Sequence, residues 1–398
     1  MAGALMQLVA YGAQDVYLTG NPQITFFKVV YRRHTNFAME SMEQALTGTA
    51  NYGNKVTCRV ARNGDLVGAT YLEATLNAAS TNNDDGVYVP RPGFAMIKNV
   101  ELRIGGQKID RQSGVWMDVW SELTSTFDQT KMLDGLVGCR SQAATNVANT
   151  ITASGLEGGE NDGQKVHVPF QFSFCRNPGL ALPLIALQYH EVELIVEFNT
   201  KGSVQSAGTG VEVGDLTNVS LWCDYIFLDT EERKNFAQNP HEYLIETVQE
   251  NTDTVTASQT DNLKLTFNHP VKELVWTYGD STGLGTYDNG GANPCASAIL
   301  KLNGQDRFSS RNGTYFNRVQ PYQHHTGNPA VGINAYSFAL KPEEHQPSGT
   351  CNFSRIDNAE LSVTNGTLGA GQTQINIFAH GYNVLRVASG MGGIAYSN

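Results

Sequence analysis

The chain has 398 residues, of which 40% are hydrophobic and 16% are charged. This length exceeds what one hydrophobic core usually fills, so two domains are expected. A formal net charge of −11 argues against a nucleic-acid-binding surface, because such surfaces neutralise phosphates with lysine and arginine.

The amino-terminal residues predict an apolar arm that leads into a strand. Tyr11-Gly12 and the cluster at 19–22 have turn chemistry, since glycine tolerates positive φ and proline fixes φ. Residues 24–31 are β-branched and aromatic, which predicts a strand. The neighbouring basic residues are interpreted as a polar strand edge rather than a phosphate site; they are Lys28, Arg32, Arg33 and His34. The arm is expected to pack on its own domain or on a neighbouring subunit.

Most later segments of the first half also predict strands. Residues 56–60 and 66–67 flank an Asn63-Gly64 turn, which predicts a hairpin. A second hairpin is expected where Gly105-Gly106 follows the alternating residues 100–104. Further predicted strands are 168–174, 192–198 and 219–228. Regular strands between turn signals favour a sandwich or barrel over a βαβ fold.

Two segments predict helices. Residues 115–127 carry apolar side chains at helical spacing, including Trp116 and Trp120, which we interpret as core contacts. Asp229 and Glu232 form a capping-box pattern that predicts a charged helix over 229–237. This helix ends before Pro240 and is the expected interdomain linker.

The two halves repeat each other. Residues 101–109 and 299–307 both predict an alternating strand closed by a Gly-Gln turn. Aromatic strands at 170–174 and 336–340, and then Glu-Leu strands at 192–194 and 359–361, follow in the same order. This order predicts two copies of one all-β domain.

Motifs for catalysis and metal binding are incomplete. Residues 48–55 approach a P-loop, but Asn54 and Val56 break the pattern, so a turn is predicted. Histidine pairs lack further ligands at metal spacing, and His324-His325 are expected to be satisfied or exposed. Paired carboxylates such as Glu343-Glu344 are interpreted as solvated faces. The sequence therefore predicts no enzyme, no catalytic residue, no cofactor and no metal site.

Cysteine spacing and hydropathy limit the remaining possibilities. The six cysteines have no CxxC spacing and are expected to be buried free thiols. No apolar run reaches the roughly twenty residues of a transmembrane helix, and no signal peptide is expected.

Residues 11–37, YGAQDVYLTGNPQITFFKVVYRRHTNF, resemble the amino terminus of the major capsid proteins of large icosahedral DNA viruses, most closely those of chlorella viruses. The resemblance continues through residues 177–194, 224–246, 336–342 and 382–398, and so spans essentially the whole chain. Departures concentrate in predicted loops, several of which are shorter than in the abundant chlorella virus protein. A paralogue with a restricted place in the shell is therefore a hypothesis.

The resemblance implies a double jelly roll: two eight-stranded antiparallel β-sandwiches in tandem, with few short helices in loops. The implied domains are an arm (1–25), a first jelly roll (26–228), a helical linker (229–240) and a second jelly roll (241–398). It also implies homotrimers of pseudo-hexagonal outline that tile the outer shell of an icosahedral virion assembled in the host cytoplasm. The implied partners are neighbouring capsomers and minor capsid proteins on the inner face, without direct contact to nucleic acid.

One modification site is implied in the same way. Capsid proteins of chlorella viruses carry glycans within (A/G)-N-T-x-T, and Asn149 lies in a matching segment, Ala148-Asn149-Thr150-Ile151-Thr152. Two other functions stay open: a carbohydrate-binding β-sandwich, since jelly rolls also form lectins, and a glycoside-processing enzyme with exposed carboxylates.

Overall fold

The computed structural model describes residues 3–77, 88–138, 164–205, 213–279, 287–369 and 372–396. Asn149 and Cys139 lie outside these residues. The chain divides into an N-terminal unit, Met1–Asn36, and a body, Phe37–Asn398. Among the described residues, no helix is both long and apolar enough to cross a membrane.

The N-terminal unit contains two short helices, α1 (Gly3–Val9) and α2 (Val16–Thr19). Residues 20–36 form neither helix nor strand, so the strand predicted over 24–31 is wrong. Strand propensity alone did not decide the outcome, because a strand needs a neighbour to pair its backbone N–H and C=O groups. Within the described part of this unit no second strand offers that pairing.

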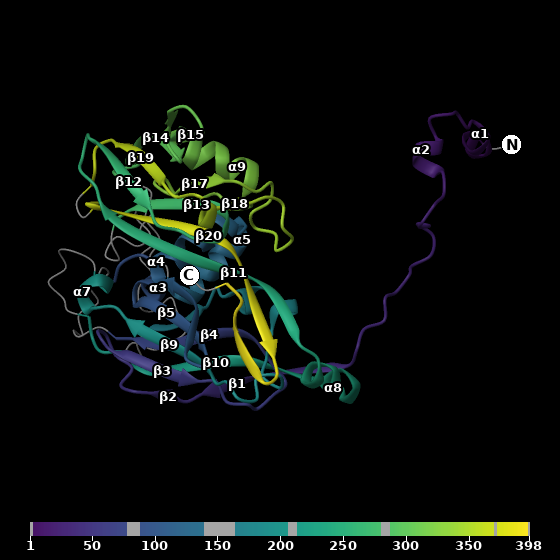
Figure 1. The fold of residues 1–398 in the computed structure, drawn as a ribbon, viewed down its shortest axis with the longest axis horizontal. Helices are drawn as coiled ribbons and strands as arrows, with labels where there is room; N and C mark the ends of the chain where they lie inside the picture. Colours follow the sequence, from purple (N-terminus) through teal and green to yellow (C-terminus); the bar gives the residue numbers. More distant parts are fainter. Residues whose placement is uncertain are drawn as a thin grey trace. The chain divides into compact units, whose positions relative to one another are not determined.

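The first half of the body is a pair of antiparallel sheets, drawn in purple to teal in Figure 1. One sheet has the order β1-β10-β4-β7, with the short strand β8 beside β4. Its strands are β1 (Phe37–Gln44), β10 (Thr217–Leu228), β4 (Leu66–Leu76), β7 (Gln164–Pro169) and β8 (Leu182–Pro183). The other has the order β2-β3-β9-β5-β6. Its strands are β2 (Leu46–Thr47), β3 (Lys55–Arg59), β9 (Val192–Phe198), β5 (Ile97–Ile104) and β6 (Gln107–Ser113).

The second half repeats this arrangement. One sheet has the order β11-β20-β13-β17 and also contains β18 and β21. Its strands are β11 (His241–Thr254), β20 (Gln374–Ala388), β13 (Pro270–Tyr278), β17 (Asn334–Ser337), β18 (Cys351–Asn352) and β21 (Met391–Ile394). The other sheet has the order β12-β19-β14-β15, with β16 beside β14. Its strands are β12 (Thr260–Leu265), β19 (Ala359–Asn365), β14 (Cys295–Leu302), β15 (Gln305–Asp306) and β16 (Arg311–Asn312).

The strand orders confirm the predicted internal repeat. The order β11-β20-β13-β17 corresponds to β1-β10-β4-β7, and β12-β19-β14-β15 corresponds to β3-β9-β5-β6. The two predicted Gly-Gln hairpins, β5-β6 and β14-β15, occupy matching places in the two halves. The same chain path is therefore used twice, as expected for tandem copies of one domain.

Helices connect and cover these sheets. The predicted helix at 115–127 is α4 (Gly114–Thr124), and Thr126 then caps a second helix, α5 (Phe127–Val137), with Gln129 completing the capping box. The predicted linker helix is α8 (Thr230–Gln238), whose first N–H is bonded by Asp229 at 2.8 Å. The shorter helices are α3 (Pro92–Ala95), α6 (Ser173–Arg176), η1 (Pro178–Leu180), α7 (Lys201–Val204), η3 (Tyr315–Val319), α9 (Gln320–His324) and η4 (Phe353–Arg355).

Two strand predictions need correction. Residues 56–67 do not form a hairpin: β3 pairs with β2 and β9, whereas β4 pairs with β10, β7 and β8. The chain crosses from one sheet to the other, since both segments carry apolar side chains for the space between the sheets. The strand predicted over 168–174 ends at Pro169, which has no N–H to donate, and the chain then turns into α6.

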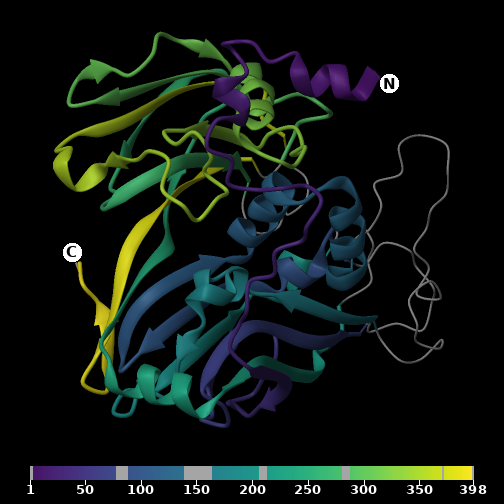
Figure 2. The same cartoon turned by 90° about the vertical axis from the view of Figure 1, so that its right-hand side faces the viewer.

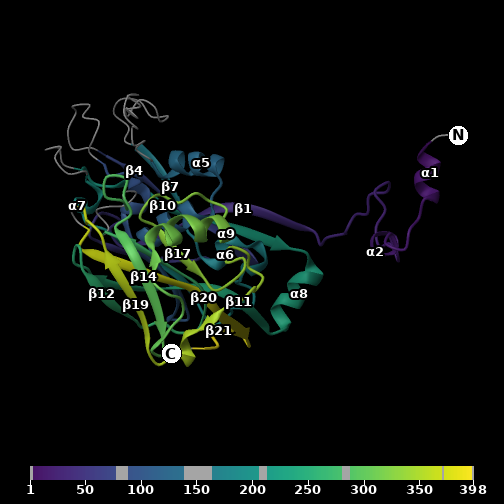
Figure 3. The ribbon, with the colours of Figure 1, turned by 90° about the horizontal axis from the view of Figure 1, so that it is seen from above.

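The two halves share a core. The largest buried apolar cluster joins first-half residues such as Trp116 to second-half residues such as Phe378, whose ring centroids are 5.2 Å apart. Strands β11 and β20 pair at fourteen positions. Figures 1 and 3 show the two strands side by side. Beyond β20, the turn to β21 contacts the first half, where the Tyr189 N–H donates to the Gly390 carbonyl at 2.9 Å. Figure 2 shows the hairpin of β20 and β21, in yellow, beside the sheets of the first half.

Candidate functional site

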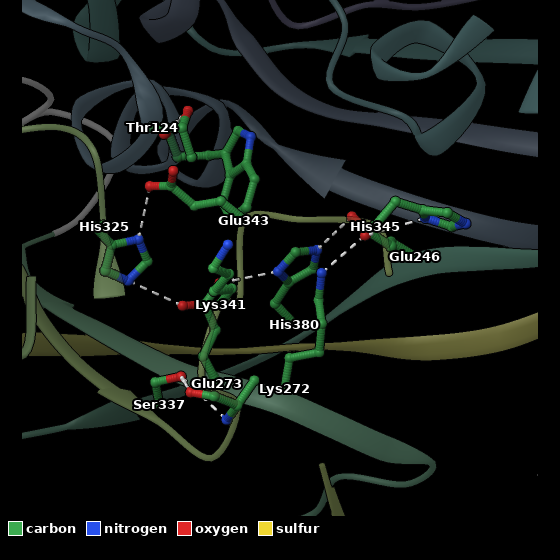
Figure 4. A network of polar contacts seen from close by, with 12 residues as sticks. Thr124, Glu246, Lys272, Glu273, His325, Ser337, Lys341, Glu343, His345 and His380 are labelled. Carbon is green, nitrogen blue, oxygen red and sulfur yellow. Dashed lines mark hydrogen bonds and ion pairs between the residues drawn. The ribbon is translucent and has the colours of Figure 1, made fainter. Parts of the chain in front are cut away.

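Charged side chains and histidines gather, buried or partly buried, where the two halves meet (Figure 4). We name this group the junction network; it consists of Arg176, Glu246, Lys272, Glu273, His325, Glu343, His345 and His380. Arg176 belongs to the first half, and the other seven belong to the second half.

A β-bulge explains how two consecutive charged residues enter the same interior. The register between β13 and β20 shifts from Val271↔Gly381 to Glu273↔His380, which leaves Lys272 as the extra residue. A bulge re-aims side chains that would otherwise alternate between the two faces of a sheet. Lys272 and Glu273 are accordingly both fully buried, with relative exposures of 0%.

Glu246 on β11 is the centre of the network. Its Oε1 lies 2.8 Å from Lys272 Nζ and 3.3 Å from His345 Nδ1. Its Oε2 lies 2.6 Å from Arg176 Nη2 and 3.2 Å from His380 Nε2. Both carboxylate oxygens are therefore contacted by side-chain nitrogens, which come from β13, β20, α6 and the loop that carries His345.

Glu273 forms the second centre. Its Oε1 lies 3.0 Å from His380 Nδ1, and its Oε2 lies 3.1 Å from His325 Nε2. The other nitrogen of His325 lies 3.1 Å from Glu343 Oε1. His325 thus bridges two carboxylates, and His380 bridges Glu246 and Glu273.

These contacts set the ionisation of the network. Burial alone would raise the pKa of Glu273, but His325 and His380 hold it well below its usual value. The pKa of Glu246 is likewise depressed by His380, Arg176 and Lys272 despite the opposing effect of burial. Burial lowers the pKa of His325, but Glu273 and Glu343 more than offset this and raise it to about 9. His325 is therefore a cation at neutral pH.

Aromatic rings enclose the first-half side of the network. The Arg176 guanidinium carbon lies 4.7 Å from the centre of the Trp120 ring, and His380 packs edge-on against the same ring at 4.6 Å between centroids. An open cavity of about 510 Å³ lies beside these residues and is also lined by Glu343 and His345.

A second buried cluster joins the helices to the second half. Arg91 Nη1 and Nη2 each lie 2.6 Å from a carboxylate of α4, Asp118 and Glu122, and Nε lies 3.1 Å from Asp134 of α5. The hydroxyl of Tyr287, from the second half, donates to Asp118. Arg91 has φ of 53°, a left-handed conformation that its three ion pairs hold in place.

This arrangement is suited to holding the two halves of the body together. The carboxylates of the junction network are already engaged by cations or histidines, and the described residues include no group of His, Cys, Asp and Glu side chains that could hold a metal ion. His325 is partnered, as expected from the sequence. Glu343, interpreted from the sequence as solvated, instead has a side chain only 20% exposed and pairs with His325.

Sequence reasoning missed the two central carboxylates. A signal was present, because Lys272-Glu273 and His380 each interrupt an otherwise apolar strand-like run. Charged residues at such positions are buried only when they are paired. The five described cysteines are unpaired thiols, of which Cys58, Cys223 and Cys295 are buried, in keeping with the prediction for this class of residue.

Comparisons with known proteins agree with this architecture. The family described as the large eukaryotic DNA virus major capsid protein matches residues 232–393, and the major capsid protein N-terminus matches residues 25–229. The chain belongs to this family of viral major capsid proteins. Its function is that of a structural capsid protein, and its fold is the double jelly roll that the resemblance implied.

Particular relatives cover the whole chain. It is 48% identical over 432 residues to the major capsid protein of Pyramimonas orientalis virus and 43% identical over 456 residues to that of Paramecium bursaria Chlorella virus 1, with 100% of each chain covered. A quasi-atomic model of the PBCV-1 virus capsid matches with a TM-score of 0.80 and 38% identity, covering 94% of this chain and 100% of that one. The Faustovirus major capsid protein, at 12% identity and a TM-score of 0.72, shows the fold alone. These relatives are named capsid proteins, and they give no support to the lectin alternative.

Proposed function

We propose that three copies of the chain form a closed homotrimer, the capsomer, that tiles an icosahedral shell. The observation that carries this proposal is the repeated strand order of the two halves. Three copies of two similar sandwiches provide six similar blocks, which suit a pseudo-hexagonal outline, and a closed threefold ring avoids open-ended growth. The partners in the shell are neighbouring capsomers and, on its inner face, minor capsid proteins.

The chain is organised in this proposal as an arm, a first jelly roll ending at 228, a helical linker at 229–240 and a second jelly roll at 241–398. The arm is residues 1–25 and the first jelly roll is residues 26–228, within which β1 begins at Phe37. The role is structural and needs no catalytic residue, and the site of assembly is the host cytoplasm.

Light scattering of the purified protein at micromolar concentration tests the oligomer. A particle three times the 43.3 kDa mass of one chain is expected. A monomer at micromolar concentration would contradict the capsomer proposal. A deletion of residues 1–25 should leave this trimer folded but unable to assemble further; loss of the trimer would place those residues in the fold of the capsomer itself.

Glycosylation at Asn149 is part of the same proposal and rests on the segment pattern alone. Glycopeptide mapping of protein from virions tests it, with an unmodified Asn149 peptide as the contrary outcome. An electron cryo-microscopy map of the virion would test the paralogue hypothesis, because assignment of this chain to most capsomers would contradict it.

A further inference from the structure

The charge of the N-terminal unit is opposite to that of the whole chain. No aspartate or glutamate occurs between Asp15 and Glu40, although the chain contains 38 acidic residues. The same stretch contains the permanent cations Lys28, Arg32 and Arg33, which are exposed and do not lie on a strand. The interpretation of these residues as a polar strand edge is therefore wrong, and their clustering needs another reason.

Large apolar side chains accompany these cations. Phe26, Phe27 and Tyr31 have relative exposures of 89%, 98% and 84%. Other exposed apolar residues of the unit are Leu5, Met6, Leu8, Val9, Tyr11, Val16, Tyr17, Leu18, Ile24, Val29 and Val30. Apolar surface on this scale marks an interaction site in a soluble protein.

Helix α1 has a composition that charge attraction alone does not explain. Gly3–Val9 contains no charged residue, and its large side chains are all exposed. The unit thus combines an uncharged apolar segment near its start with a basic aromatic segment near its end. Stable peripheral attachment to a membrane commonly combines these two signals, apolar insertion and basic residues facing anionic headgroups.

We propose that the N-terminal unit binds an anionic lipid surface. Its apolar side chains enter the interface between headgroups and acyl chains, while Lys28, Arg32 and Arg33 contact lipid phosphates or carboxylates. The attachment is peripheral, since none of the described helices is long and apolar enough to span a bilayer.

The distribution of apolar residues favours lipid over a protein groove. Phe26 and Phe27 lie in a turn, and Val29, Val30 and Tyr31 follow without strand structure, so these apolar side chains do not form the alternating row of an added strand. A protein edge that binds an added strand reads alternate side chains in pockets, whereas a fluid interface accepts apolar side chains in any register. Nucleic acid would account for cations and aromatic rings but not for the uncharged α1.

Vesicle flotation with the full-length protein tests this proposal. Vesicles are made of phosphatidylcholine alone or of an equimolar mixture with phosphatidylserine. We expect binding to the mixed vesicles that weakens as salt is raised, and much weaker binding to phosphatidylcholine alone. The triple variant K28Q/R32Q/R33Q should bind the mixed vesicles roughly a hundredfold more weakly, at about fivefold per basic residue.

A control variant has the same loss of three positive charges, but at residues of the body instead of the N-terminal unit. The variant K108Q/K264Q/R355Q removes three exposed basic residues there and should retain vesicle binding. A second variant, F26S/F27S, keeps the cations and should lose affinity for the mixed vesicles, which pure charge attraction would not predict.

Three outcomes would overturn the proposal: no flotation, equal flotation with both kinds of vesicle, or full binding by K28Q/R32Q/R33Q. Binding to duplex DNA without flotation would assign the segment to nucleic acid instead. Mass photometry of each variant separates these outcomes from failure of the proposed trimer, since the lipid test is read only on protein of unchanged mass.

Discussion

Arg176 of the first half and Glu246 of the second half form an ion pair with 2.6 Å between Nη2 and Oε2. Removing charges from water is costly, so a buried pair of this kind adds little net stability compared with a well-packed apolar contact. Removing one partner nevertheless destabilises the fold, because the other charge would then be buried without a counter-charge. The junction network therefore favours one defined arrangement of the two halves over alternatives.

Substitution of the central carboxylate tests this role. Glu246→Gln leaves Arg176 and Lys272 without their shared anion, and we expect a loss of about 3–5 kcal/mol in the free energy of unfolding. Glu242→Gln on the same strand is the control: its pair with Arg386 is exposed, with side chains 64% and 63% accessible, so less than about 1 kcal/mol is expected. Urea denaturation of both variants measures the difference, and equal effects would remove the special role of Glu246.

The histidine bridge predicts loss of stability at alkaline pH. The pKa of His325 in the folded protein is about 9, above the ordinary value of 6.5. Its contribution is therefore complete below about pH 6.5 and is lost as the pH rises through 9, by roughly 3 kcal/mol. The depressed pKa of Glu273 acts in the opposite direction, so its contribution is present above its ordinary value of 4.5 and is lost only in acid.

Urea midpoints of the wild-type protein and of His325→Gln, measured from neutral pH to above pH 9, check this prediction. The difference between the two proteins should narrow across that range as wild-type His325 loses its proton. A difference that stays constant would show that His325 is neutral in the folded protein.

Alanine substitutions at two glycines should change the stability of the protein in opposite directions. Gly381 lies where β20 pairs with β13 beside the bulge, and a Cβ there would lie 2.4 Å from the carbonyl oxygen of Pro270. We therefore expect Gly381→Ala to destabilise the protein by about 1–3 kcal/mol. A Cβ on Gly135 in α5 would meet nothing within 4 Å, and Gly135→Ala should stabilise the protein by roughly 0.5–1 kcal/mol. Thermal unfolding of both variants measures the signs, and a neutral Gly381→Ala would contradict the close approach.

Buried thiols should resist alkylation. Burial raises the pKa of Cys58 and Cys295 to about 12 and that of Cys223 to about 11, so few thiolates form at mildly alkaline pH. We expect iodoacetamide to leave these three cysteines unlabelled in the native protein and to label them in guanidinium chloride. Peptide mass mapping measures the labelling, and rapid native modification of any of them would indicate local opening.

Local patterns of residues determine much of the fold. The Gly105-Gly106 turn and the cap at Asp229 depend on neighbours in sequence, and each is present as predicted. The repeated order of strands is also present, although residues 170–174, predicted as one of its strands, do not form a strand. The same local patterns misassigned residues 24–31, because a strand also requires a partner that the sequence does not place. They likewise paired residues 56–60 with 66–67, which belong to different sheets.

The tertiary structure alone decided which charges are buried. The sequence does not single out Glu246, Glu273 or Arg176, and Arg176 lies far from the two glutamates in the chain. Their pairing depends on a bulge in β13 and on the packing of α4 and α6 against the second half. Composition and periodicity describe one element at a time, whereas burial of an ion pair depends on the distance between elements. The sequence by itself thus determined a family and a repeated all-β architecture, and only the assembled halves determined the junction that joins them.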